Sequence, residues 1–231
     1  MEKKPCNKEI LKILAEKSST KQFVFRQTKT LFKTFKSVIS EIAEELNSHI
    51  CNIDNSVVVE YKDTGEYEAQ IHFSGDVIIF QMHSNVFTFE KNHHIFKTSY
   101  IKDDPMRAYF GEIHMYNFLA DSFRYDRSAD YGFLMGRVFV NKDQHFFMEG
   151  QRQFGFMFNN LPVDVFEPEN MRHVVERSMV YALDFDLTAP NFNEMREVTV
   201  NQITAFGSSL NLSTRKKLGF KFSYENYNKV K

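Results

Sequence analysis

Tryptophan is absent from this chain of 231 residues, and cysteine, proline and glycine are scarce, with two, five and nine residues respectively. The two cysteines, Cys6 and Cys51, show no metal-site spacing and are too few for a disulfide framework. No apolar run reaches the roughly 18 residues of a membrane span, and Met1–Pro5 is not followed by the apolar stretch of a secretory signal. We therefore expect a cytoplasmic protein that does not span a membrane.

Phenylalanine is the residue that the chain has in excess. It contains 25 Phe and 10 Tyr, and 14 of these 35 side chains lie within residues 109–158, among arginines and carboxylates. Phenylalanine favours strands and buries a large apolar area. We therefore predict that residues 109–158 form several antiparallel strands around an aromatic core.

Charge is unevenly distributed although the formal net charge is only −1. Residues 1–36 carry ten lysines and arginines against three glutamates, and residues 215–231 carry six against one, whereas the middle of the chain is acidic. Such asymmetry marks an interaction surface in some proteins. The alternative is that both basic ends lie against the acidic body.

The apolar periodicity predicts a single α+β domain over residues 1–231. We expect a helical segment over 1–52, an antiparallel sheet over 56–160, a helical pair over 164–212 and an edge strand over 218–224. The sheet should have about seven to nine strands, strongly twisted or partly closed, with N-terminal and C-terminal helices packed on it. The strand count includes separate strands at 77–80, 86–89 and 95–100.

Within the N-terminal segment we predict a short helix over 7–17 and a longer one after Thr20 that ends near Cys51. The longer helix has apolar residues at the spacing of three and four that one buried helix face requires. These residues are Val24, Leu31, Phe35, Val38, Ile39, Ile42 and Leu46. A later helix should begin at Glu167-Pro168, and another after Asn191.

Two turns are predicted from glycine positions. Gly65, in the left-handed position of a three-residue turn, would pair Lys62 with Glu66. Gly150, at the first central position of a two-residue turn, would place Glu149 opposite Arg152 and His145 opposite Phe156.

Arg137 is the exception in the apolar strand 133–140, and a guanidinium there needs an anionic partner or access to water. A three-residue loop after this strand would place Arg137 opposite Glu149, whereas a two-residue loop would pair it with Met148. We therefore take as the candidate ligand-binding site a group of two arginines, two glutamates and two histidines. These residues are Arg137, Glu149, Arg152, His145, Glu112 and His114.

This group could bind a carboxylate, a phosphate or a planar ligand among aromatic side chains. Its histidines and glutamates could alternatively hold zinc or iron. The simplest interpretation is a structural network of ion pairs that closes one end of an aromatic core. We assign no metal ion and no cofactor to it.

Two further hypotheses rest on other residues. A basic stripe of Arg26, Lys29, Lys33 and Lys36 could contact nucleic-acid phosphates, although most such helix faces are simply solvated. A metal-dependent hydrolase would need carboxylates such as Glu45, Asp54 and Glu60 to converge near Lys62.

No phosphate-binding glycine loop, nucleophile elbow or Cys/His nucleophile pattern is present. We therefore expect a non-enzymatic protein that binds a small anionic or planar ligand or a protein partner and that can form a homodimer. A nucleic-acid-binding protein is the first alternative, and a metal-dependent hydrolase is the second.

Overall fold

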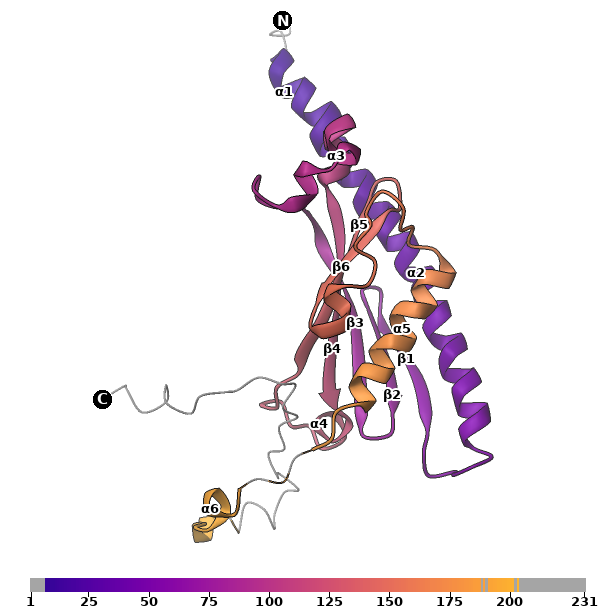
Figure 1. Ribbon diagram of the computed structural model, residues 1–231, viewed down its shortest axis with the longest axis vertical. Coiled ribbons are helices and arrows are strands. Elements are labelled where there is room, and N and C mark those ends of the chain that lie inside the picture. The colour runs from indigo at the N-terminus through magenta and orange to yellow at the C-terminus, as the bar shows by residue number, and fades with distance from the viewer. Residues whose placement is uncertain (1–6, 188, 190, 202, 204–231) are drawn as a thin grey trace, which may run out of the picture.

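The computed structural model describes residues 7–187, 189, 191–201 and 203. It is an α+β structure in which one long helix and one shorter helix lie on a six-stranded antiparallel sheet (Figure 1). Among the described residues, no helix combines enough length and hydrophobicity to cross a membrane.

The N-terminal helical segment is continuous. Helix α1 (Lys8–Ile13) leads through a π-helical turn, η1 (Leu14–Ser18), into α2 (Ser19–Ile50), where two separate helices were predicted. The first two elements bury no residue and project beyond the sheet (Figure 1). Helix α2 buries five of the predicted apolar residues, whereas Leu46 is exposed. The five are Val24, Phe35, Val38, Ile39 and Ile42.

The sheet is a meander whose spatial order follows the chain from β1 to β6. Its strands are β1 (Val59–Gly65), β2 (Glu68–Phe73), β3 (Asp76–Phe87), β4 (Phe110–Leu119), β5 (Phe133–Asn141) and β6 (Phe146–Gly150). Every neighbouring pair is antiparallel, and the β1–β2, β3–β4 and β4–β5 ladders each contain an irregularity.

The prediction of seven to nine strands is not confirmed, because the described residues form six. Residues 77–80 and 86–89 do not form two strands, because β3 runs continuously to Phe87 and absorbs the break as a bulge after Met82. Residues 95–100 lie in a helical connection. It comprises the 3-10 turns η2 (His94–Lys97) and η3 (Pro105–Ala108) on either side of α3 (Ser99–Asp103).

The predicted turn at Gly150 is also wrong, because β6 ends there and a 3-10 turn, η4 (Arg152–Gly155), follows. A Cβ atom at Gly150 would lie 2.5 Å from the Cβ of Phe154 and 2.7 Å from the Met135 carbonyl oxygen. Glycine is therefore needed for close packing, and the chain beyond it folds back over β6. Phe154 is fully buried against Tyr181.

The first hairpin differs from its prediction in register. Tyr61 pairs with Ile71 and Lys62 with Gln70, so the turn lies beyond Gly65, which still has a positive φ of 145°. The shift is even in residue number, so each side chain stays on its predicted face. Glu60 now faces His72, which removes the carboxylate repulsion with Glu68 that the predicted register implied.

The C-terminal helical pair is seen in part. Helix α5 (Pro168–Leu183) begins at the predicted proline and lies beside α2 on the sheet (Figure 1). Asn191 caps a second helix, α6 (Phe192–Met195), which has only four residues. The rest of the expected pair is described only in part, and the expected strand 218–224 lies outside the described residues.

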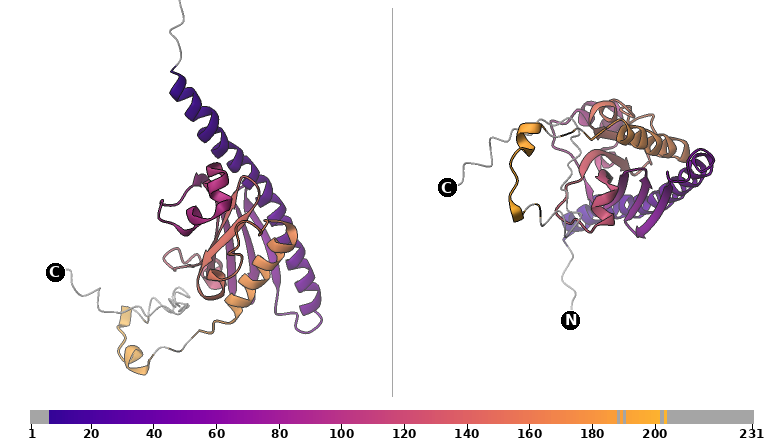
Figure 2. Two further views of the ribbon diagram at one scale, coloured as in Figure 1. Left: turned by 45° about the horizontal axis from the view of Figure 1, so that its top comes forward. Right: turned by 90° about the horizontal axis from the view of Figure 1, so that it is seen from below.

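Helices α2 and α5 cover the same face of the sheet, which we call the covered face (Figures 1 and 2). Side chains from both helices and from β2 to β6 form its core. The fully buried members include Phe32, Phe35, Ile39, Ile71, Phe80, Ile113, Val138, Phe146, Phe166 and Val174. The opposite face, which we call the open face, carries the polar side chains described next.

Candidate functional site

A row of polar residues crosses the open face from β2 to β6. The ladders pair Glu68 with Gln81, Gln81 with His114, His114 with Arg137, and Arg137 with Glu149. Residues directly opposite on adjacent strands point to the same face and lie close enough to interact. These five residues therefore form one continuous strip, which we call the polar row.

The last pairing answers a question that the sequence left open. Asn141 N–H donates to the His145 carbonyl, which leaves Lys142, Asp143 and Gln144 as a three-residue loop. The loop has no glycine, and Gln144 takes the left-handed conformation with φ of 65°. Arg137 consequently faces Glu149 and not Met148.

Arg137 is held by two carboxylates. Its Nη1 donates to Glu112 Oε1 at 3.0 Å, and its Nη2 donates to Glu149 Oε2 at 2.6 Å. The guanidinium also lies over the Phe139 ring, 5.0 Å from its centroid. Because both carboxylates bind the guanidinium, the positive charge of Arg137 is neutralised where it stands.

The network continues on both sides of this arginine. His114 Nε2 lies 2.8 Å from Glu112 Oε1, and the Tyr116 hydroxyl lies 3.0 Å from His114 Nδ1. On the other side His93 Nε2 lies 3.5 Å from Glu149 Oε1. A chain of polar groups thus runs from Tyr116 through Arg137 to His93.

Burial and neighbouring charges shift the pKa values of two groups in this network. Glu112 is only 4% exposed, and burial by itself raises the pKa of its carboxyl. The hydrogen bonds and charges of His114 and Arg137 outweigh that effect, so the pKa of Glu112 lies below its ordinary value. Burial and the neighbouring His94 lower the pKa of His93. Within the described part of the chain, its buried Nδ1 has no hydrogen-bond partner.

Aromatic clusters flank the polar row at both ends of the strands. At one end Phe110, Phe139 and Phe147 pack with Phe89 and with the helical connection between β3 and β4. At the other end Phe118 packs edge-on against Phe123 of α4 (Ala120–Arg124). The polar row thus lies between two aromatic clusters on the same face of the sheet.

A hollow of about 510 Å³ opens beside the β2 and β3 part of this strip. Glu68, Gln81, His83 and His114 contribute to its lining, together with residues of the β1–β2 turn. The rings of His83 and His114 lie 6.2 Å apart at a tilted angle. Hydrogen-bonding groups and flat rings therefore converge at a surface that solvent can reach.

The structure brings together four of the six predicted site residues, namely Glu112, His114, Arg137 and Glu149. His145 does not join them. Its ring stacks on Tyr100, and its Nδ1 lies 2.9 Å from the Leu161 carbonyl oxygen. Arg152 lies on η4 and not opposite Glu149, because the strand ends at Gly150.

The predicted site omitted Tyr116, His93, Glu68, Gln81 and His83. Tyr116 could have been found, because the alternation of Glu112, His114 and Tyr116 places all three on one face of a strand. Gln81 depends on the register between β3 and β4, and His93 on a connection that folds over the sheet. Those two had no local signal.

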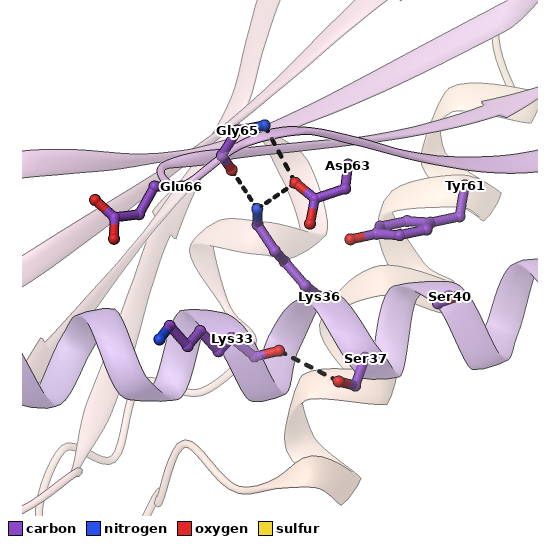
Figure 3. Close-up of a pocket in the computed structure, with 8 residues that line it drawn as sticks. All are labelled: Lys33, Lys36, Ser37, Ser40, Tyr61, Asp63, Gly65 and Glu66. Atoms are coloured by element: carbon purple, nitrogen blue, oxygen red, sulfur yellow. Dashed lines mark hydrogen bonds and ion pairs between the residues drawn. The ribbon is translucent and has the colours of Figure 1, made fainter.

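Two of the four residues in the basic stripe of α2 form ion pairs with the sheet. Lys29 Nζ pairs with Glu66 at 2.6 Å, and Lys36 Nζ pairs with Asp63 at 2.6 Å and with the Gly65 carbonyl. Figure 3 shows Lys36 reaching from α2 to the end of β1, with Lys33 beside it. The expectation that Lys36 lies on a solvent face is wrong, because its side chain closes the contact between helix and sheet.

These ion pairs also shift the carboxyl groups that the lysines meet. The hydrogen bond from Lys36 lowers the pKa of Asp63, and the hydrogen bond from Lys29 lowers the pKa of Glu66. Two of the four basic residues thus have protein carboxylates where a phosphate would have to bind.

The carboxylates of the hydrolase hypothesis do not converge. Asp54 accepts hydrogen bonds from Ser56, Glu60 pairs with Lys62 on the same strand, and Glu45 pairs with Arg172 of α5. Across the part of the chain that the structure describes, no group of three or more histidine, cysteine or acidic side chains is placed to hold a metal ion.

No protein-family model matches the chain, and no curated protein and no solved structure matches it either.

Proposed function

We propose that this chain is a binding protein that holds a small planar ligand on the open face of its sheet, over the polar row. One observation carries the proposal: five polar residues from five strands face one another in register across a surface that aromatic clusters flank at both ends. A fold that needed this face only for stability would gain more from apolar residues there.

The charges around Arg137 favour one class of planar ligand over another. Three carboxylates, those of Glu68, Glu112 and Glu149, lie along the strip, and two of them bind the guanidinium. An anionic ligand would therefore compete with protein carboxylates for Arg137. A neutral or cationic ligand that donates hydrogen bonds would meet free acceptor capacity instead.

The shape of the hollow also supports a small ligand. Its volume of about 510 Å³ lies in the range of roughly 300–1,000 Å³ that is usual for ligand pockets. The imidazoles of His83 and His114 offer faces and edges on which a flat ring can stack. Gln81, which is exposed in the middle of the polar row, offers both a donor and an acceptor.

Three probes of one shape and different charge test this proposal. Benzamidine, benzamide and benzoate are titrated separately into the whole chain, and the histidine ring signals are followed by nuclear magnetic resonance. Benzamidine should shift the signals of His83 and His114 most, benzamide less and benzoate least. For ligands of this size we expect dissociation constants of about 1 mM or weaker.

Two variants locate the effect. Gln81→Ala and His83→Ala should each reduce the benzamidine shifts at His114, whereas His49→Ala, at the far end of α2, should leave them unchanged. Equal shifts for all three probes, or strongest binding of benzoate, would refute the charge preference. No shift with any probe would refute the proposed site.

A further inference from the structure

The two edge strands of the sheet, β6 and β1, differ in whether another segment pairs with their outer sides. Residues 158–166 run along β6, where Phe146 N–H donates to the Asp164 carbonyl, Met148 N–H donates to the Phe158 carbonyl, and His145 forms a bridge with Val165. Strand β1 forms the opposite edge of the sheet, and no other strand within residues 7–187 pairs with its outer side.

The outward direction of β1 is marked by one hydrogen bond. Val59 N–H donates to Asn47 Oδ1 of α2 at 3.1 Å, so this group does not point toward β2. Backbone groups of alternate residues point to the same side of a strand. The N–H and C=O groups of Tyr61 and Asp63 therefore lie on the outer edge, where a further strand would meet them.

The charged side chains of β1 are complementary to those of a second, antiparallel β1 strand. If two β1 strands pair antiparallel about Tyr61, Glu60 of each copy lies opposite Lys62 of the other. Both residues lie on the open face, because Val59 and Tyr61, which alternate with them along the strand, pack on the covered side. Among the described residues, Lys62 Nζ pairs with Glu60 on its own strand, at 3.2 Å, and both side chains are about half exposed.

There is also space beside this edge. A hollow of about 640 Å³ lies between α2 and the end of β1, lined by Lys33, Lys36, Ser37, Ser40 and Tyr61 among others (Figure 3). Side chains that a neighbouring strand turns toward the helices would enter this hollow. Helix α2 reaches this edge at Val59 and Gly65, and between them Glu60, Lys62, Asp63 and Thr64 are exposed.

We propose that two copies of this chain associate through the outer edges of their β1 strands, antiparallel about Tyr61, so that one sheet continues across both copies. Such an interface is isologous, with each copy contributing the same surface. The symmetry axis stands perpendicular to the sheet, which places both open faces on the same side. The dimer then presents two polar rows side by side.

Charge reversal tests the register as well as the interface. Lys62→Glu and Glu60→Lys are prepared as separate variants of the whole chain, and self-association is measured by sedimentation velocity over a range of concentrations. Each variant brings like charges together twice, so we expect self-association at least about tenfold weaker than that of the unsubstituted chain. An equal mixture of the two variants restores both opposite-charge pairs and should recover a mixed dimer.

Matched controls are Glu90→Lys and Lys102→Glu, which reverse exposed charges outside β1 and should leave self-association unchanged. Circular dichroism and thermal unfolding of every variant show whether the fold is kept. An unsubstituted chain that stays monomeric would refute the proposal, as would association that neither reversal weakens. Failure of the mixture to associate would refute the antiparallel register.

One other occupant of the edge would be recognised in the same samples. If the unsubstituted chain is monomeric while the amides of Tyr61 and Asp63 resist hydrogen exchange, another part of the same chain covers β1. That result would overturn the dimer.

Discussion

The two faces of the sheet differ in the kind of side chain that they bury. The covered face meets α2 and α5 with apolar side chains such as Phe35, Phe80 and Val174, which need no polar partner. The open face buries Glu112 almost completely and then supplies it with Arg137 and His114. Stability of the first face comes from removing apolar area from water, whereas the second depends on the completeness of an ionic network.

This difference separates stabilising residues from candidate binding residues. A buried charged group contributes little net stability compared with an apolar group of the same size, so its presence needs another explanation. On the covered face the loss of any large side chain leaves a cavity. On the open face the loss of one partner leaves another charge unpaired. Substitutions on the two faces should therefore lower the stability of the fold for different reasons.

The largest effect is expected on the covered face. Phe35 is fully buried and packs against Phe80 at a ring-centroid distance of 5.1 Å and against Phe166 at 5.5 Å. Phe35→Ala should lower the free energy of unfolding by about 3–5 kcal/mol, measured by chemical denaturation. Phe23→Ala, on the same helix but about half exposed, should change it by less than about 0.5 kcal/mol. Similar losses for both would contradict the assigned burial.

A smaller effect should follow from removing Arg137. Arg137→Met leaves Glu112 and Glu149 without their shared cation, and should cost about 1–3 kcal/mol at neutral pH because the arginine is partly exposed. The double variant Arg137→Met with Glu112→Met removes the stranded charge as well. Its unfolding free energy should recover part of the loss, and a further additive loss would show that the ionic network is not the cause.

The smallest effect concerns pH. The pKa of Glu112 is lower in the folded chain than its ordinary value, so its ionised form stabilises the fold above that ordinary value. The contribution disappears as pH falls through the lowered folded pKa. Unfolding free energies measured between about pH 6 and pH 3 should therefore fall less steeply for Glu112→Gln than for the unsubstituted chain. Parallel curves would show that Glu112 contributes nothing to the acid dependence.

Much of the covered face could be predicted from the sequence, because its signals are periodic. The spacing of Val24, Phe35, Ile39 and Ile42 indicates one buried stripe, and Pro168 marks the start of α5. The alternation in β1 and β2 also places side chains on the correct faces despite the wrong register. Periodicity survives an even shift, so faces are easier to predict than partners.

The ends of the sheet could not be predicted in the same way. Gly150 fits a hairpin turn locally, yet the burial of Phe154 among the helices decides that the chain turns into η4 instead. The same change places Arg152 on η4 and not on a strand opposite Glu149, and the ring of His145 stacks on Tyr100. Lys36 is buried because the end of β1 packs against it, with Asp63 and the Gly65 carbonyl as its partners. Each of these outcomes depends on contacts between distant parts of the chain.

The order of the strands has a consequence for how the molecule assembles. Each strand pairs with the one before it in the chain, and the longest connection, residues 88–109, joins β3 to β4. The sheet therefore needs no pairing between strands that are distant in the strand order. The covered face, however, needs α2 from the beginning of the chain and α5 from after the last strand. During synthesis α2 is made before the strands that it packs on. Part of the apolar covered face stays exposed to solvent until α5, which ends at Leu183, has left the ribosome. Docking of α5 is therefore the step that completes the core.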